Sequence, residues 1–494
     1  MDLLQLLQSL LWQESHSHRV AYFIPFIVTL LLALILLFLL KPNRGGKLNL
    51  PPSPPKLPII GNLHQLGSLP HRSLQALSNQ HGPLMFLHLG CAPTLVVSSP
   101  EMVREMIKSH DIIFANRVRT TAVDIFLNGS TDLVFAPYGE HWRKVKKLCV
   151  QELLSPDRVQ SFQFLKEEEV DILVKKIRCS CLEGKPVNLS EMLVNVTNNI
   201  IFRTIVGQRN EEEEEDDALT GVTLRLKRTY KEIDAFFELV IKEHKNKMLT
   251  TLGGQSNQEN FVEILLQLQE DGMLDFDLNQ DSIKAILLDM FVGTTDTSIT
   301  TMEWAMAELM KRPIIMKKAQ EEVREVVGRK SKVVVNDVNQ MCYLKCIIKE
   351  TLRLHPPVPF LVPRETSASA RLGGYDIPCK TRVYVNSWAI HRDPKFWEKA
   401  EEFLPERFSS NNNPMDFIGK DFQYIPFGGG RRVCPGMSAG LATVEFVLAN
   451  LLYWFDWELP GSAEELDMSE VFGLAIHKKV PLHLAATPYY PLNL

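Results

Sequence analysis

A lone cysteine lies in a glycine-rich loop near the carboxyl end of the 494-residue chain. Residues 427–436 read Phe-Gly-Gly-Gly-Arg-Arg-Val-Cys-Pro-Gly, and the apolar run 437–452 that follows predicts a helix. Consecutive glycines let the backbone approach a flat ligand closely. Arg432 and the amino end of a helix would both stabilise a thiolate at Cys434. The pattern therefore predicts a cysteine thiolate that binds a metal, with a buried structural cysteine as the plainer alternative.

A second set of residues able to do chemistry lies in the middle of the longest helix that the sequence predicts, 281–311. Its run 293–298, Gly-Thr-Thr-Asp-Thr-Ser, gathers small and hydroxyl side chains. Such residues are poor choices for a helix interior unless they act there. Because a buried carboxylate is costly unless it is partnered or functional, we expect Asp296 to be buried and to transfer protons.

Two pairs of residues stand at helical spacing elsewhere. Glu350 and Arg353 are three residues apart, just before a His-Pro-Pro sequence ends their helix, and Trp142 and Lys146 are four residues apart in a basic helix. Each pair would therefore share one helix face. A solvated helix face would look the same, so either pair alone is a weak signal.

In this order, the motifs resemble those of the cytochromes P450, most closely the plant microsomal A-type group. The cysteine loop matches the family's haem-ligand signature at each fixed position, namely Phe427, Gly430, Arg432, Cys434 and Gly436. The resemblance implies a mainly α fold with a small β region. It also implies haem b, held between the long helix and the loop, with Cys434 as the axial thiolate ligand of the iron. A thiolate ligand favours cleavage of the O–O bond.

The same resemblance implies roles for the other motifs. Asp296 and Thr297 would be the catalytic residues that deliver protons to dioxygen, although Thr294 stands where the family has a second glycine. Trp142, Lys146 and Arg364 would contact the haem propionates, with the difference that lysine lacks the bidentate fork of the family's arginine. Glu350, Arg353 and Arg407 would form a buried charge network. The residues implied as substrate contacts are Phe126, Leu127, Gly293, Val358, Phe360, Leu361, Leu474 and Ala475.

The amino-terminal residues predict a membrane anchor. Residues 21–40 form an uncharged apolar run long enough to span a bilayer, and more positive charges follow it than precede it. By the positive-inside rule, we expect residues 1–20 to be luminal and residues 59–494, which the resemblance implies are the haem domain, to be cytosolic. Residues 41–58 are a basic and proline-rich hinge. We expect a single-pass protein of the endoplasmic reticulum membrane.

The segment 207–222 departs from the family pattern. Helical periodicity stops near Gly207, an acidic run follows, and a basic helix begins almost at once. Similar family members have two further helices and a lid loop here. We estimate that the chain lacks on the order of twenty-five to thirty residues, about two ordinary helices.

Composition and resemblance together bound the function. A net charge of −5 without a basic stripe excludes nucleic acid as the predicted partner, and eight scattered cysteines do not suggest a disulfide framework. The resemblance implies a monooxygenase that inserts one atom of O2 into a small apolar plant metabolite, such as a terpenoid, coumarin or other phenylpropanoid. Its electrons would come from NADPH through cytochrome P450 reductase, with cytochrome b5 as a second implied partner.

Three alternatives stay open. The first is a P450 that forms rings oxidatively or rearranges a peroxide, and the presence of both Asp296 and Thr297 argues against the peroxide reaction. The second is a haem-binding variant that is impaired because the lid is missing, which a ferrous–CO spectrum would test. The third is a metal protein with a cysteine loop and no haem.

Overall fold

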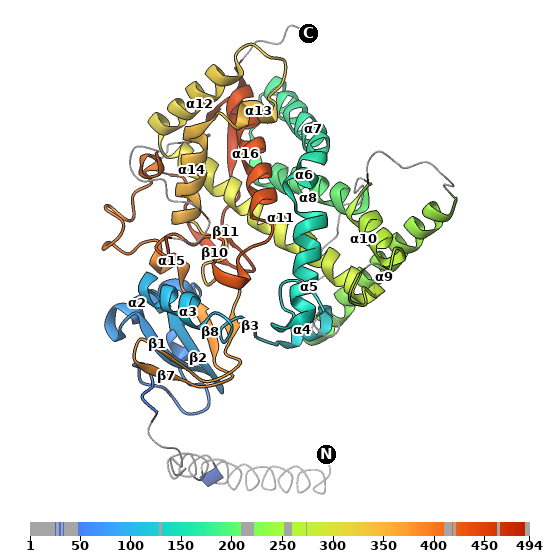
Figure 1. The fold of residues 1–494 in the computed structure, drawn as a ribbon. Helices are drawn as coiled ribbons and strands as arrows, with labels where there is room; N and C mark the ends of the chain where they lie inside the picture. Colours follow the sequence, from blue (N-terminus) through green and yellow to red (C-terminus); the bar gives the residue numbers. More distant parts are fainter. Residues whose placement is uncertain are drawn as a thin grey trace, which may run out of the picture.

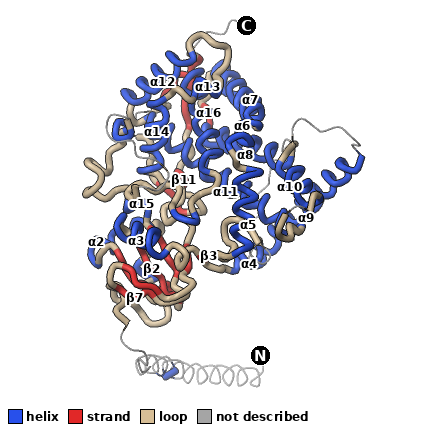
Figure 2. The backbone as a smooth tube through the Cα atoms, viewed as in Figure 1, coloured by secondary structure: helices blue, strands red, loops and turns tan. Residues whose placement is uncertain are grey.

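The computed structural model describes residues 48–127, 131–208, 222–250, 259–272, 274–409, 417, 421–461 and 465–489, with Pro25, Thr29, Leu30 and Ala33. Figure 1 shows a strand-rich end, built largely from the first residues of this range, below a larger helical part. Figure 2 shows the same division, with one cluster of strands at one end and a mostly helical remainder that holds a few further strands. The predicted fold class, mainly α with a small β region, is confirmed.

The strand-rich end is organised around one five-stranded sheet in the order β1-β2-β8-β5-β3. Strand β2 pairs parallel with β8, and the other pairs are antiparallel. The elements of this end are α2 (Pro70–His81), β1 (Leu84–Leu89), β2 (Ala92–Val97), α3 (Pro100–His110), β3 (Asn116–Arg117), β5 (Arg364–Glu365), β6 (Ala370–Leu372), β7 (Tyr375–Ile377), β8 (Arg382–Val385) and α15 (Ser387–Ile390).

The helical part surrounds α11 (Gln280–Met310), which packs against α8, α14 and α16. Its other helices are α4 (Thr121–Phe126), α5 (Glu140–Leu148), α6 (Pro156–Ser161), α7 (Gln163–Leu182), α8 (Leu189–Val206), α9 (Val222–Thr250), α10 (Phe261–Glu270), α12 (Pro313–Val327), α13 (Val335–Val338), α14 (Cys342–Leu354) and α16 (Met437–Trp454). The remaining strands are β4 (Val187–Asn188), β9 (Phe455–Glu458), β10 (Glu470–Phe472), β11 (Ile476–Lys478) and β12 (His483–Pro488).

Local sequence explains where several elements begin and end. The side chain of Ser99 accepts a hydrogen bond from the Met102 amide, and Pro100 occupies the first position of α3, where a missing N–H costs nothing. At the end of α8, Gly207 adopts a left-handed conformation with φ +79°, which suits a residue without a Cβ. The predicted helices at 281–311 and 437–452 are confirmed, with boundaries that differ by at most two residues.

The proline-rich lead-in is attached to the strand-rich end from Asn49 onward. The Asn49 amide donates to the Asp376 carboxylate at 2.9 Å, and the Phe86 amide donates to the Pro52 carbonyl at 2.9 Å. Apart from the four residues named above, the predicted anchor at 21–40 lies outside the described residues and stays a prediction. In the described part of the chain, α16 alone is long and apolar enough to cross a membrane, and its burial in the core marks it as a core helix.

Candidate active site

The cysteine loop is shaped by glycine and held by Asp111 at the end of α3. Gly430 has φ +69°, and a Cβ there would lie 2.7 Å from the Asp111 carboxylate. That carboxylate accepts a hydrogen bond from the Arg431 amide at 2.8 Å, and the Cys434 amide donates to the Phe427 carbonyl at 3.0 Å. The loop therefore needs glycine at position 430 both for its backbone conformation and for contact with Asp111.

The surroundings of Cys434 favour the thiol rather than the thiolate. Its side chain is accessible, but desolvation raises the pKa of the thiol, against the opposing effects of the Gly436 amide and Lys146. The Arg432 guanidinium donates to backbone carbonyls and does not contribute to lowering the pKa of the Cys434 thiol. The predicted thiolate at Cys434 therefore depends on the metal ion that it binds. The positive charge of a bound metal ion would reverse the balance, because it binds the deprotonated sulfur.

Three buried arginines from distant parts of the chain meet beside this loop. Arg117, Arg364 and Arg432 are 7%, 4% and 7% exposed. Desolvation, followed by the charges of Arg364 and Arg432, lowers the pKa of Arg117 well below its usual range. Desolvation and Arg364 also lower the pKa of Arg432 to about 10. Like charges that repel in a buried position indicate a site that receives an anion.

Backbone carbonyls hold these cations in place. Arg117 donates to the Val362 carbonyl at 2.5 Å and to the Val134 carbonyl at 3.0 Å. Arg364 donates to the Gly429 carbonyl at 2.8 Å and Arg432 to the Ala115 carbonyl at 2.8 Å. Asp111, 3.4 Å from Arg364, is the carboxylate in ion-pair contact with the cluster. Neutral carbonyls orient the guanidinium groups, and the charge of Asp132 acts on Arg117 and Arg432, so positive charge still exceeds the negative charge of these two carboxylates.

Trp142 and Lys146 lie next to the cluster, but their polar groups face the backbone. The Trp142 indole N–H donates to the Leu133 carbonyl at 2.9 Å, and the Arg432 guanidinium lies 4.1 Å from the ring centroid. Lys146 donates to the Arg431 carbonyl at 2.6 Å. Sequence reasoning missed Arg117, which stands two residues before Arg119 in a stretch without clear periodicity.

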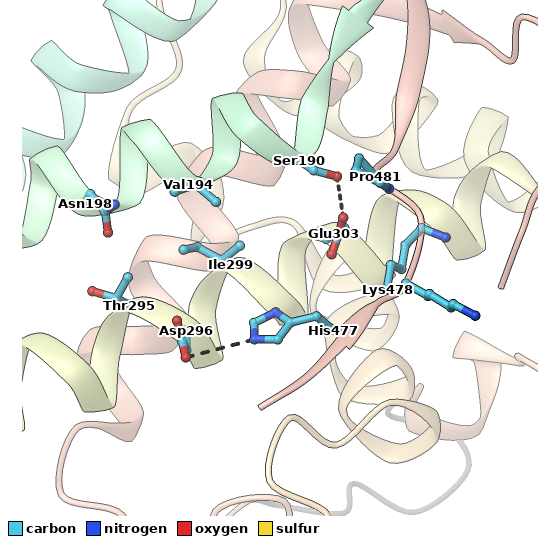
Figure 3. A pocket seen from close by; sticks show the side chains of 11 residues that line it. Ser190, Val194, Asn198, Thr295, Asp296, Ile299, Glu303, His477, Lys478 and Pro481 are labelled. Carbon is cyan, nitrogen blue, oxygen red and sulfur yellow. Dashed lines mark hydrogen bonds and ion pairs between the residues drawn. The ribbon is translucent and has the colours of Figure 1, made fainter. Parts of the chain in front are cut away.

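Within α11, the Thr297 hydroxyl donates to the Gly293 carbonyl at 2.8 Å, and the helix stays α-helical throughout. Figure 3 shows Asp296 pointing toward His477 of β11, with Oδ2 and Nε2 4.0 Å apart. The Asp296 side chain is 38% exposed. The expectation that it is buried is therefore wrong, because it projects from the helix into a cavity rather than into the core.

Glu350 and Arg353 are fully buried and form a bidentate pair with both N···O distances at 2.7 Å. Arg407 approaches the same carboxylate at 3.3 Å, and the Leu404 amide donates to it at 2.8 Å. Arg353 also donates to the carbonyls of His391, Ala400 and Glu402. The three charged residues are therefore joined in one hydrogen-bonded network.

Comparison with known proteins identifies the family. The sequence model described as Cytochrome P450 matches residues 51–224 and 218–484. The chain is a cytochrome P450. It is 48% identical to the phenylacetaldehyde oxime monooxygenase of Prunus mume, over 97% of this chain and 98% of that one. It is 52% identical to cytochrome P450 71A1 of Persea americana, over 86% and 91% of the two chains.

Solved structures agree with this assignment. A zebrafish cytochrome P450 with progesterone is 27% identical, has a TM-score of 0.75, and aligns over 85% of this chain and 99% of that one. Members of the family hold haem iron through a thiolate and receive electrons from a reductase, so the predicted cofactor is confirmed. The buried arginines of this P450 fit such a group, because haem carries two propionates that would supply the missing negative charge.

The alignments show that this P450 is shorter than its relatives inside the chain. The alignment with the Prunus mume enzyme has 522 positions but takes in 97% of 494 residues, so about 40 positions of the relative have no counterpart here. The corresponding figure for the Persea americana protein, from 458 positions and 86%, is about 30. The two stretches matched by the family model meet at residues 218–224.

The residues predicted to contact substrate do not form one group in this P450. The Phe126 ring packs on the Tyr230 ring of α9 with centroids 6.2 Å apart, whereas Leu127 is buried. Phe360 is 8% exposed and packs with Leu74, Met85, Leu87 and Val96, and its contact with a substrate stays a prediction.

The two hairpin residues also differ from each other in exposure. Leu474 is 65% exposed at the tip of the β10–β11 hairpin, whereas Ala475 is buried. Gly293 on α11 is exposed, and Val358 and Leu361 are half-buried. Of this set, Phe126, Gly293, Val358, Leu361 and Leu474 keep accessible surface.

Proposed function

We propose that this P450 is a haem-thiolate monooxygenase that inserts one atom of O2 into a small apolar plant secondary metabolite. The observation that carries the proposal is the buried cluster of Arg117, Arg364 and Arg432 beside a loop with a single cysteine. Elsewhere in the described residues, no group of three or more His, Cys, Asp or Glu could hold a metal ion. A metal protein without haem therefore has no comparable site there.

Haem bound at this site would supply the chemistry of oxygen activation. In the proposal, the Cys434 thiolate would hold the haem iron, and Phe427, Gly430 and Gly436 would shape the loop that presents it. Arg364 and Arg432, joined by Arg117, would hold the propionates, and Lys146 would add a fourth positive charge. Trp142 would act indirectly, since its ring supports the Arg432 guanidinium and its N–H fixes the Leu133 carbonyl.

Two residues of α11 would handle protons. Asp296 faces a cavity from which protons can enter, and Thr297 is held with its oxygen toward the helix by the bond to the Gly293 carbonyl. The carboxylate would pick up a proton on the cavity side and release it on the other, and the hydroxyl would steer it toward the reacting oxygen. Glu350, Arg353 and Arg407 would fix the backbone near the cysteine loop without touching the reaction.

The relatives point to the substrate class and the partners. One acts on phenylacetaldehyde oxime, and another, 44% identical over 94% of this chain, is the premnaspirodiene oxygenase of Hyoscyamus muticus. In the proposal, NADPH-derived electrons arrive through cytochrome P450 reductase, with cytochrome b5 as a second partner, at the endoplasmic reticulum membrane. Arg143, Lys147 and Arg431 are exposed on and near α5 and would form part of the reductase surface.

We also propose that the lid segment of the family is shortened after Gly207. Three findings support it: helix α8 ends at Val206, α9 begins at Val222, and the relatives carry about 30 to 40 positions that are missing here. A variant impaired in catalysis by this loss is the second candidate function.

The ferrous–CO difference spectrum of microsomes that contain the chain tests both candidates. We expect the Soret peak of thiolate-ligated haem, lost in Cys434→Ala and kept in the matched control Cys342→Ala, whose cysteine is also exposed. A peak in Cys434→Ala equal to that of the wild type would refute Cys434 as the ligand. A wild-type protein without the peak would favour the impaired variant.

A further inference from the structure

A cavity of about 300 Å³ lies between α8, α11 and the end of β11, on the side of α11 that carries Asp296. Figure 3 shows Asn198 and Val194 of α8 facing Thr295 and Asp296 of α11, with His477 closing the cavity from the strand. Its lining mixes apolar, neutral polar and charged side chains, so the cavity is not a purely apolar void.

Two buried oxygen atoms in this lining have no hydrogen-bond partner among the described residues. They are Asn198 Oδ1 and Thr295 Oγ1. Buried polar groups without a protein partner are usually satisfied by ordered water, which occupies about 30 Å³ per molecule. The cavity therefore has both the room and the partners for several water molecules.

His477 and the acid of α11, Asp296, line this cavity side by side. Its Nδ1 is 2.9 Å from the Thr300 hydroxyl, its Nε2 is 4.0 Å from Asp296 Oδ2, and its side chain is 32% exposed. The hydrogen bond at one ring nitrogen fixes which nitrogen carries the mobile proton. With Nδ1–H donating to Thr300 Oγ1, Nε2 is the atom that gains and loses a proton.

We propose that His477 relays protons from cavity water to Asp296. The proposal rests on the monooxygenase function above and adds a residue to it. In each transfer, the N–H bond at Nε2 of the imidazolium breaks and an O–H bond forms at Asp296 Oδ2. A cavity water, itself resupplied by solvent, then returns one proton to Nε2, and the Nδ1–H bond to Thr300 persists throughout. One bridging water or a small side-chain rotation closes the 4.0 Å gap.

The charges around His477 suit this role. Asp296 and Glu303 of α11 contribute negative charge on one side, and Lys478 and Lys479 contribute positive charge from its own segment. The α8 side of the cavity offers Ser190 and Asn198, which are uncharged. Glu303 is engaged by the Ser190 hydroxyl, so Asp296 is the carboxylate left to receive the proton.

The first test asks whether solvent reaches His477 in the apoprotein. Carbethoxylation by diethyl pyrocarbonate, read by peptide mass spectrometry, should modify His477 at a rate within about threefold of that of the exposed His483. Asn198→Leu, which fills the cavity with apolar atoms, should slow modification of His477 by at least about fivefold and leave His483 unchanged. A His477 that does not react in the wild type would overturn the proposal.

The second test uses the haem-loaded, full-length protein with reductase. The rate of NADPH oxidation should fall about tenfold in His477→Phe, less than the hundredfold or more of a lost general acid, because cavity water still reaches Asp296. The solvent deuterium isotope effect on this rate should be larger in His477→Phe than in the wild type. His477→Gln keeps polar contacts but carries no proton, so it should be as slow as His477→Phe, whereas His483→Phe should match the wild type.

The combination with Asp296→Asn decides whether the two residues act in series. If His477 works through Asp296, adding His477→Phe to Asp296→Asn should slow NADPH oxidation no further. Additive effects, or recovery of the wild-type rate in His477→Gln, would refute the relay. Failure of the proposed function is distinguishable, since the wild type would then lack the ferrous–CO peak or oxidise no NADPH.

Discussion

Asp289 of α11 holds in place the loop at residues 133–134, whose carbonyls contact Trp142 and Arg117. Removing the Asp289 carboxylate should therefore destabilise the candidate haem site, although Asp289 does not itself belong to the arginine cluster. Its Oδ2 accepts hydrogen bonds from the Leu133 amide at 2.8 Å and the Val134 amide at 3.0 Å. The carbonyls of the same two residues accept from Trp142 and Arg117. The position of α11 is thereby transmitted through one short loop to Arg117 of the cluster and to Trp142 beside it.

The expected loss of unfolding free energy follows from the two amide hydrogen bonds to Asp289. Asp289→Ala leaves both amides without an acceptor, and each stranded group costs about 1–3 kcal/mol, so the free energy of unfolding should fall by about 2–6 kcal/mol. Asp289→Asn keeps an oxygen in the same place and can donate to Asp132, so its cost should stay below about 1 kcal/mol. Asp281→Asn, at an exposed position in the first turn of α11, is the matched control.

The difference in stability between the wild type and Asp289→Asn should change with pH in a direction that the pKa of Asp289 determines. Desolvation and the neighbouring Asp132 raise the pKa of Asp289 well above its ordinary value of 3.8. A raised pKa in the folded state means that the stabilisation is complete below the unfolded pKa and is lost as pH rises through the folded value. Because asparagine does not titrate, the stability of Asp289→Asn relative to the wild type should improve as pH rises above 3.8.

Urea unfolding of the apoprotein, followed by tryptophan fluorescence at several pH values, measures both effects. Haem transfer to an acceptor protein measures the consequence for the site, and Asp289→Ala should lose haem faster than Asp289→Asn. If the alanine and asparagine variants were equally stable, the two amide hydrogen bonds would not carry the effect. If the difference between wild type and Asp289→Asn did not change with pH, the carboxyl pair would not hold a proton.

Three further variants probe the rest of the site. Arg353→Ala strands the fully buried Glu350 and should cost about 3–5 kcal/mol of unfolding free energy in urea; a loss below about 1 kcal/mol would contradict the network. Arg117→Gln removes one buried cation and should speed haem loss by roughly tenfold or more, the effect of a charged hydrogen bond; an unchanged rate would remove Arg117 from the site. Thr297→Val should raise the hydrogen peroxide formed per NADPH several-fold, and unchanged coupling would contradict its role.

Sequence was sufficient wherever a feature depends on neighbours along the chain. Pro100 and Ser99 start α3, Gly207 ends α8, and the acid and base at 350 and 353 face each other because one helical turn separates them. The glycine-rich loop around Cys434 carries its own signature. In each case the determining contacts lie within a few residues.

The parts that sequence missed depend on contacts between distant segments. Arg117 reaches the Val362 carbonyl across 245 residues, and no local pattern reports such a contact. The exposure of Asp296 is set by a cavity between three elements, and the burial of Phe360 by helix and strands of the sheet region. The desolvation that raises the pKa of the Cys434 thiol also comes from the folded surroundings and has no signal in the local sequence.

The shortening that we propose after Gly207 leads to the last prediction. Apolar side chains of three nearby helices are unusually exposed, with Val194 at 37%, Phe236 at 38%, Leu239 at 56% and Val292 at 40%. Fully burying such a side chain contributes about 1.5–3 kcal/mol, so covering these half-exposed ones would contribute about 1 kcal/mol each.

Inserting the corresponding segment of the Prunus mume relative should therefore raise the unfolding free energy by about 2–4 kcal/mol and reduce binding of a hydrophobic dye. A glycine-serine segment of equal length is the control, since it restores chain length without apolar surface. Equal stability of the two insertions would mean that chain length alone matters. A relative's segment that destabilised the protein would instead show that the short form is a working architecture, whose helices have adapted to the absence of a lid.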